Sequence, residues 1–283
     1  MGNSVKELVE LALITALRER KKFFGNTYLP FCLFDHVERQ GLDIKFVDIS
    51  SFEGMYSKEP GPLILLSSQR PHGRQYFNCA HEYGHHLFDH GMKVDELVKS
   101  KNTNKFDSKE FLVDTFAGFL LMPKTTVQQA FQKRSQTITS AKPIEYFKIA
   151  SNLGVGYQTL LFHLYKSLRL LNKVEFEKRK KKTVKFIKKE LLAQDFPGEV
   201  IFVDENWVGR PVDIQIDDVL VVEGEHKISG DLIEKIAVIN ERIIYKGSEV
   251  GIEKLIVENA GPIFLRVSRN KYIGFNKYKH LEE

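Results

Sequence analysis

One short segment of the chain gathers side chains that can bind a metal ion. The stretch FNCAHEYGHHLFDH, residues 77–90, holds four of the nine histidines and two acidic residues. Within it, His81, Glu82 and His85 form the pattern H-E-x-x-H. Helical residues four apart share a face, so both imidazoles can reach one ion about a turn apart. The pattern predicts two metal ligands on one rigid element.

Glu82 has a different role in this pattern. It is rotated by about 100° from His81 around a regular helix, so it does not readily ligate the same ion. It can instead reach a water molecule bound there. Zinc lowers the pKa of such a water to about 7, and a neighbouring carboxylate can take its proton during attack on a carbonyl. The pattern favours Glu82 as the general base of a hydrolase.

A third ligand separates a metal site from a solvated helix with coincidental histidines. Asp89 lies four residues beyond His85, but a straight helix carries its carboxylate a further turn along. His90 does not fit the extended pattern H-E-x-x-H-x-x-G-x-x-H, because Phe88 and Gly91 stand where glycine and histidine are needed.

Glu110 fits best as the third ligand. It lies near the start of KEFLVDTFAGFLLMP, and a second helix packed across the first would bring it to the ion. The resulting His/His/Glu set leaves the fourth position for water. Asp114, one turn later, can accept the other ring N–H of a ligand histidine and fix its tautomer. The alternative is an exposed helix face, although the flanking Phe111 and Phe116 predict that one side is buried.

The segments that must position these residues are predicted as follows. Gly84, in the middle of the metal helix, suggests that another element approaches closely, and Ser108 is the expected N-cap of the helix with Glu110. Pro143–Leu171 reads as helix, glycine turn, helix. Helices are expected at 4–22, 31–41, 73–89 and 108–122, strands at 43–49 and 61–69, and several short strands after residue 191.

Charge divides the chain into three parts. Residues 1–172 have a net charge of +5, residues 173–190 of +6 and residues 191–283 of −6. A dense basic segment ahead of an acidic, strand-rich region indicates a linker or connecting helix between two domains. We therefore expect a catalytic domain at 1–172, a connecting segment at 173–190 and a β-rich sensing or substrate-recognition domain at 191–283.

Composition excludes several classes of protein. The apolar fraction of 42% suffices for a packed core, and no apolar run approaches the roughly 18 residues of a membrane span. The two cysteines, Cys32 and Cys79, exclude a disulfide framework and a Cys-rich zinc cage, and they indicate a reducing, cytoplasmic setting. No membrane partner is expected.

The segments GRQYFNCAHEYGHHLF and EFLVDTFAGFLLMP together resemble the ImmA/IrrE family of bacterial metallopeptidases, over about residues 30–170. The resemblance implies that His81, His85 and Glu110 bind Zn²⁺ and that Glu82 is the catalytic base. The chain departs from the family in having Asp89 where histidine is common and Asp114 where asparagine is usual. Neither change removes a ligand.

The resemblance also implies a fold and a substrate. The expected fold is α+β, with a zincin-like, mainly helical N-terminal domain that has a small sheet, followed by a β-rich C-terminal domain. The expected activity is site-specific cleavage of a helix-turn-helix repressor of the Xre type. The segment 61–69, if it is an edge strand, offers a place where an extended peptide can pair.

A DNA-binding regulator with a structural metal is the alternative function. The segment 143–171 has the length and glycine turn of a helix-turn-helix, and the basic segment follows it. Against this, the second helix is rich in leucine, which suits burial better than base contact, and the acidic region after residue 191 would repel phosphate. The sequence therefore favours the peptidase, with nucleic acid as a weaker candidate partner.

Overall fold

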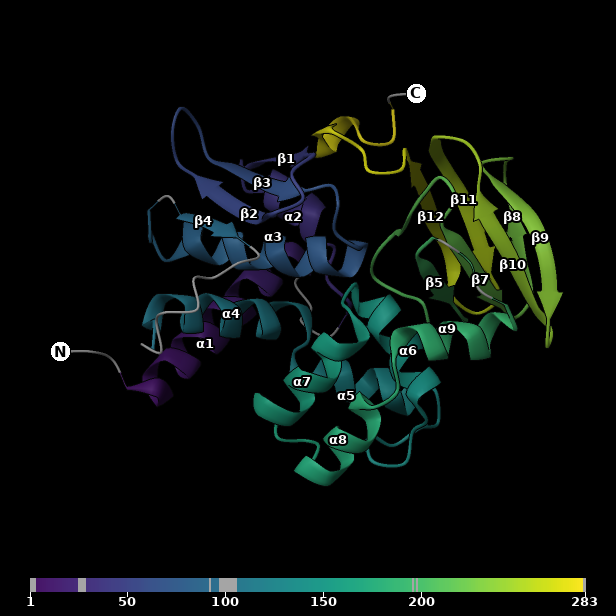
Figure 1. The fold of residues 1–283 in the computed structure, drawn as a ribbon, viewed down its shortest axis with the longest axis horizontal. Coiled ribbons are helices and arrows are strands. Elements are labelled where there is room, and N and C mark those ends of the chain that lie inside the picture. Colours follow the sequence, from purple (N-terminus) through teal and green to yellow (C-terminus); the bar gives the residue numbers. More distant parts are fainter. Residues whose placement is uncertain are drawn as a thin grey trace. The chain divides into compact units, whose positions relative to one another are not determined.

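The computed structural model describes residues 4–24, 29–91, 93–96, 106–194, 196 and 198–281. The chain folds into two compact units (Figure 1). The first comprises Met1–Pro123 and Lys271–Lys277, and the second comprises Lys124–Asn270 and Tyr278–Glu283. The predicted α+β class is confirmed, since helices and sheets both contribute to the structure.

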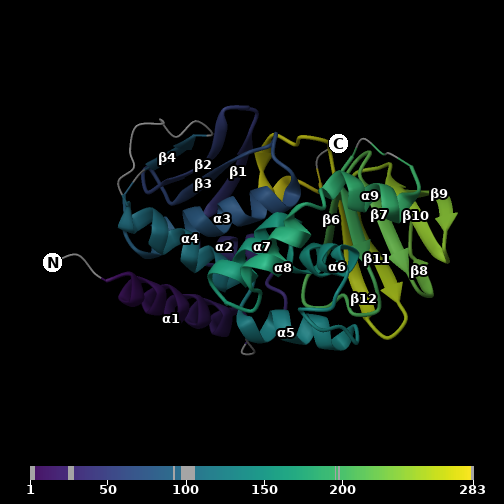
Figure 2. The same cartoon turned by 60° about the horizontal axis from the view of Figure 1, so that its bottom comes forward.

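The first unit stacks a sheet, a central helix and two further helices. The sheet lies on α3, α3 packs on α4, and α4 packs on α1, an order that Figures 1 and 2 both show. In α1, Leu8, Ala12 and Ala16 recur every fourth residue and are buried, so they form the face that meets α4. The helices are α1 (Val5–Phe24), α2 (Leu33–Arg39), α3 (His72–Leu87) and α4 (Ser108–Leu121).

The sheet of the first unit has the strand order β13-β1-β3-β2-β4. Its central strands β1 and β3 are parallel, with Ile44 beside Ile64 and Phe46 beside Leu66. These four side chains are buried and form the apolar layer of the sheet. The strands are β1 (Asp43–Val47), β2 (Phe52–Ser57), β3 (Leu63–Ser67), β4 (Lys93–Glu96) and β13 (Gly274–Phe275).

The expectation that segment 61–69 is an edge strand is wrong. Its strand, β3, is paired with β1 on one side and with β2 on the other. All of its backbone donors and acceptors therefore face neighbouring strands, and no extended peptide can add to it. Its apolar character, Leu63 to Leu66, is typical of a strand that is central in a parallel pair.

In its described residues, the second unit combines five α-helices with two four-stranded sheets, of strand orders β5-β7-β10-β9 and β6-β12-β11-β8. Trp207 and side chains from both sheets, among them Leu220, Leu255 and Leu265, form its buried core. The helices are α5 (Lys124–Lys133), α6 (Pro143–Leu153), α7 (Tyr157–Lys166), α8 (Lys173–Lys180) and α9 (Val184–Leu192). The strands are β5 (Val200–Val203), β6 (Val212–Gln215), β7 (Val219–Glu223), β8 (His226–Ile228), β9 (Ile233–Ile239), β10 (Arg242–Gly247), β11 (Gly251–Val257) and β12 (Gly261–Ser268).

Residues 173–190, expected to connect two domains, are helical and belong to the second compact unit. They form α8 and most of α9, which pack on α7 and α6. Phe176 and Ile187 are buried there, so the segment has an apolar face beneath its basic one. Strand β13, near the end of the chain, pairs with β1 and belongs to the first unit.

The described residues include no helix that is both long and apolar enough to span a bilayer.

Candidate metal centre

Three side chains from two helices converge in the first unit. His81 and His85 lie one turn apart on α3, and Glu110 lies in the first turn of α4. Nε2 of His81 and Nε2 of His85 are 3.2 Å apart. Oε2 of Glu110 is 3.5 Å from Nε2 of His81, and Oε1 is 3.4 Å from Nε2 of His85. The structure thus brings together the three residues that the sequence analysis selects as ligands.

The size of this group suits a zinc ion. Ligand atoms about 2.0–2.1 Å from a tetrahedral ion lie roughly 3.3 Å from one another. The measured separations of 3.2 to 3.5 Å are close to that value. All three side chains are buried, at 6%, 1% and 9% relative exposure for His81, His85 and Glu110. Among the described residues, His81, His85 and Glu110 form the group whose potential ligand atoms lie close enough together to hold a metal ion.

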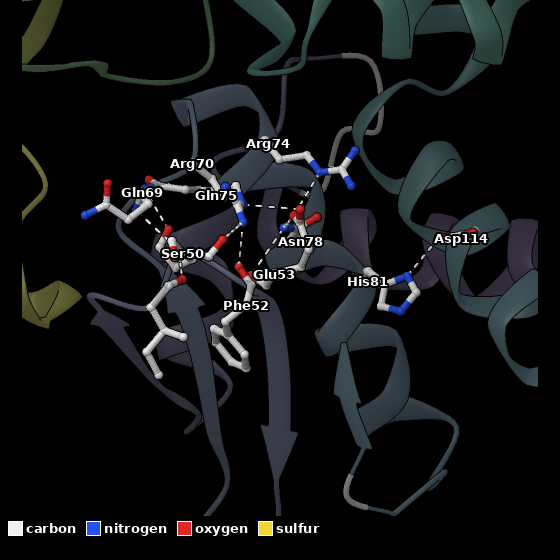
Figure 3. Close-up of polar contacts among 12 residues, drawn as sticks. Ser50, Phe52, Glu53, Gln69, Arg70, Arg74, Gln75, Asn78, His81 and Asp114 are labelled. Atoms are coloured by element: carbon white, nitrogen blue, oxygen red, sulfur yellow. Dashed lines mark hydrogen bonds and ion pairs between the residues drawn. The ribbon is translucent and has the colours of Figure 1, made fainter. Parts of the chain in front are cut away.

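The second ring nitrogen of His81 has a carboxylate partner. Nδ1 of His81 lies 2.8 Å from Oδ1 of Asp114 (Figure 3). Since Asp114 can only accept when ionised, this bond keeps the proton on Nδ1 and leaves the lone pair of Nε2 directed at the ligand group. This geometry matches the orienting role expected for Asp114.

His90 makes the corresponding contact with His85. Their Nδ1 atoms are 3.2 Å apart. Burial, and also the positive charge of Lys109, lowers the pKa of His90 to about 4. Its neutral ring can accept the Nδ1–H of His85, which leaves Nε2 of His85 unprotonated. His90, a candidate third ligand in the sequence, instead contacts Nδ1 of His85, the ring nitrogen that does not belong to the ligand group.

Glu82 projects from α3 toward strand β2 and is 1% exposed. It packs against Gly54 of β2, where a Cβ would lie 2.8 Å from Oε1 of Glu82 and 3.1 Å from its Cγ. Only glycine at this position leaves room for the carboxylate. Glu82 lies outside the three-residue donor group, as the rotation around the helix requires.

Two features bring α4 close enough to deliver Glu110. A Cβ on Gly84 would lie 3.0 Å from Cβ of Val113 and 3.1 Å from Cδ1 of Phe116. The expected close approach at Gly84 is therefore confirmed, and the approaching element is α4. The N-cap of α4 is Asp107 rather than Ser108: Oδ1 of Asp107 accepts from the backbone N–H of Glu110 at 3.3 Å. Both residue types cap helices well, so only the structure distinguishes them.

The other candidate ligand, Asp89, lies outside the group. It follows the end of α3 with a left-handed φ of 51°. Its carboxylate pairs with Lys58 at 3.1 Å, and both side chains are exposed. The helix thus ends before Asp89 can share a face with His85.

Several neighbours of the motif have structural partners. The hydroxyl of Tyr83 donates to Glu19 at 2.6 Å in the core, and Nδ1 of His86 is 2.8 Å from the hydroxyl of Tyr56. Burial raises the pKa of the Cys79 thiol well above its usual value, so Cys79 is a neutral core residue. Tyr83, His86 and Cys79 therefore have structural roles and lie outside the donor group.

A polar cluster at the first turns of α3 was not foreseen. Glu53 of β2 is surrounded by Arg70, Arg74 and Asn78 (Figure 3). Strand β2 is not among the strands expected from the sequence, and neither Glu53 nor Gly54 is among the expected site residues. One signal is present in the sequence: Arg74, Asn78 and His81 have the three- and four-residue spacing of one helical face.

Comparison with known proteins identifies one part of the chain. Residues 37–165, which include every proposed site residue, match the family model described as the IrrE N-terminal-like domain of a peptidase family. No curated protein sequence matches the chain. Among solved structures, a Mycobacterium tuberculosis transcriptional regulator is similar at 14% identity and a TM-score of 0.38, over 56% of this chain and 51% of that one. The alignment thus spans about half of that regulator.

Proposed function

Because residues 37–165 form an IrrE N-terminal-like domain of a peptidase family, we propose that this protein is a zinc-dependent endopeptidase that hydrolyses a peptide bond within a protein substrate. The observation that carries the proposal is the triangle of His81, His85 and Glu110, whose edges of 3.2 to 3.5 Å suit zinc. Glu82, on the next position of the same helix, supplies the base that hydrolysis needs.

The reaction divides between the metal and the side chains. His81, His85 and Glu110 would hold the zinc ion, which would act there as a Lewis acid, polarising the scissile carbonyl and acidifying a water molecule. Glu82 accepts a proton from the attacking water and returns it to the leaving nitrogen. The side chain of Glu82 fills the space that a Cβ on Gly54 would occupy, so strand β2 limits the positions open to the carboxylate.

The proposal is tested by metal content and by proteolysis. The purified protein should contain one zinc, and Glu82→Gln should retain it while losing cleavage, since Glu82 activates water without ligating the ion. The substrate proposed from the family resemblance is a helix-turn-helix repressor of the Xre type. Co-expression with a repressor encoded next to this protein, followed by intact-mass analysis, would show whether a cut appears with the parent protein and not with Glu82→Gln. Loss of zinc from Glu82→Gln would contradict the assigned roles.

A DNA-binding regulator with a structural metal receives less support. On α7, Leu160, Leu161 and Leu164 are fully buried, and Phe162 is one of the few exposed residues. The exposed residues of α7 are Gln158, Phe162 and Lys166, so a large apolar side chain stands between its two exposed polar ones, whereas a recognition helix presents polar side chains to base edges. Zinc-dependent binding of duplex DNA without cleavage of any protein would reverse this preference.

The strand-rich region from Val200 to Ser268 is proposed to recognise the substrate or a signal and to do no chemistry. It contains none of the proposed ligands. Its sheet β6-β12-β11-β8 exposes Ile252, Ile256 and Phe264 at 50%, 45% and 59%, and exposed apolar groups of this kind mark interaction surfaces. Phe264→Ser should slow cleavage of the repressor several-fold but leave hydrolysis of a short peptide unchanged; equal effects on both would contradict this role.

A further inference from the structure

Two arginines share one buried carboxylate next to the proposed active site. Glu53 is 8% exposed. Its Oε1 lies 3.2 Å from Nε of Arg70, and its Oε2 lies 3.0 Å from Nε of Arg74 and 2.7 Å from Nδ2 of Asn78. Figure 3 shows these groups gathered around Glu53, with His81 further along the same helix. One negative charge thus faces two positive charges, and the cluster carries a net positive charge.

The two arginines are held in different ways. Arg70 is 16% exposed in its side chain, and its Nη2 donates to the backbone carbonyls of Ser50 and Phe52. The side chain of Arg74 is 55% exposed. Within the described part of the chain, Arg74 is engaged through Nε alone. Glu53 therefore fixes the inner nitrogen of Arg74 and leaves both terminal amino groups directed at solvent.

The need to neutralise the charge of Glu53 does not explain why a second arginine, Arg74, pairs with it. Arg70 already supplies a positive charge, and Asn78, itself 8% exposed, supplies a further donor. A half-exposed ion pair adds little to stability. The two terminal amino groups of an arginine match the two oxygens of a carboxylate, and a guanidinium that is already oriented loses less entropy when it binds one. The arrangement suits recognition of an acidic group.

The position of Arg74 relates it to the site of cleavage. Arg74 and His81 are seven residues apart on α3, nearly two full turns, so they share a face and lie about 10 Å apart along the helix axis. An extended peptide covers that distance in about three residues. We infer that Arg74 is a specificity-determining residue that binds an aspartate or glutamate side chain of the substrate about three residues from the scissile bond. This inference rests on the proposed function, since it takes the group of His81, His85 and Glu110 as the point of cleavage.

The test measures binding without cleavage. Zinc-loaded Glu82→Gln protein is immobilised and incubated with tryptic peptides of a bacterial proteome, and bound peptides are identified by mass spectrometry. Peptides with Asp or Glu should be enriched over length-matched peptides without them, and adding Arg74→Gln should reduce that enrichment by about three- to tenfold. Arg74→Lys, which keeps the charge but not the paired donors, should give an intermediate value.

Two further variants control for folding and for net charge. Glu53→Gln together with Arg74→Gln removes both charges, so no buried carboxylate loses a partner, and it should lose the enrichment as fully as Arg74→Gln alone. Arg39→Gln makes the same charge change on α2 and should leave the enrichment unchanged. The inference is overturned if the enrichment persists in Arg74→Gln and in the double variant, or if Arg39→Gln lowers it as much as Arg74→Gln does.

Cleavage separates this inference from the proposed function. With Glu82 intact, cuts mapped in the same peptides should show Asp or Glu at a fixed position, about three residues away, and Arg74→Gln should abolish that preference while the zinc content stays the same. Cuts that depend on Glu82 but show no acidic preference overturn the role of Arg74 alone. Capture that depends on Arg74, with no cleavage by any variant, supports carboxylate binding and overturns the peptidase.

Discussion

Gly54 and Glu82 are in contact across the packing of β2 on α3: a Cβ on Gly54 would lie 2.8 Å from Oε1 of Glu82. The strand thus forms one wall of the space that the proposed base occupies. A buried carboxylate beside a ligand group must be held in one position to work as a base, and here the absence of a side chain on the strand sets that position.

Gly54→Ala should therefore reduce catalysis and leave the metal in place. The added methyl group forces the Glu82 carboxylate to move, and displacement of a catalytic group by about 1 Å can cost a hundredfold in rate. We expect kcat to fall by at least tenfold, with one zinc still bound. Gly61→Ala is the matched control, because a Cβ there meets no atom within 4 Å. Full activity of Gly54→Ala would show that the base is not confined by β2.

Glu110, rather than Asp89 or His90, should dominate metal affinity. Glu110→Ala removes one of three protein ligands. Loss of a residue that only hydrogen-bonds to a ligand weakens metal binding by about 10- to 100-fold, and Glu110→Ala should weaken zinc binding by more than that. Asp89→Ala should have no measurable effect, since its exposed carboxylate pairs with Lys58. His90→Ala should fall between them, because its ring orients His85. Competitive titration with a zinc chelator measures all three, and any other order contradicts the assignment.

Asp114 should affect affinity through the orientation of His81. Asp114→Ala removes the acceptor 2.8 Å from Nδ1 of His81, and we expect zinc affinity to fall by about 10- to 100-fold. Asp114→Asn retains an oxygen acceptor and should lose much less. Equal losses in the two variants would indicate that the charge of Asp114 matters rather than its hydrogen bond.

The metal group was predictable because its geometry is mostly local. Helical spacing alone places His81 and His85 on one face, and the residues around Glu110 have the apolar pattern of a helix that packs on another. Gly84 gave a correct signal of where that packing is closest. A single long-range event, the packing of α4 on α3, then completes the group.

The parts that the sequence did not predict depend on long-range pairing. Strand β2 mixes Glu53 and Gly54 with apolar residues and shows no regular alternation in burial, so its pattern is not that of a strand. The central position of β3 follows from its neighbours and not from its own residues. Likewise, nothing in the segment 274–275 indicates that it pairs with β1.

Gly84→Ala should destabilise the fold, although alanine is the better helix former. The helix preference for alanine is worth about 1 kcal/mol. Against this, the new Cβ would lie 3.0 Å from Cγ1 of Val113, and overpacking of a core costs about 1–3 kcal/mol. We expect a net loss of about 1 kcal/mol in the free energy of unfolding, measured by urea denaturation. Val113→Ala should relieve part of that loss in the double variant, and strict additivity would mean that the two side chains do not collide.

The contact between Asn276 and Glu38 should make the stability of the first unit depend on pH. Nδ2 of Asn276 donates to Oε2 of Glu38 at 3.0 Å, and burial raises the pKa of Glu38 despite this bond. A carboxyl group whose pKa is raised by folding opposes folding when it ionises, so its cost appears as pH rises above the unfolded-state pKa of about 4.3. Asn276→Ala removes the bond that favours the ionised form and should raise the pKa further.

The free energy of unfolding should therefore fall in Asn276→Ala by about 1–3 kcal/mol at pH 7 and by clearly less near pH 4, where Glu38 is mostly protonated in both states. Lys6→Ala is the control in the same unit: its ion pair with Glu10 joins side chains that are 86% and 59% exposed, so it should cost at most about 0.5 kcal/mol at both pH values. Urea denaturation at the two pH values measures both variants. A loss in Asn276→Ala that is the same at both values would show that Glu38 is not the group through which Asn276 stabilises the unit.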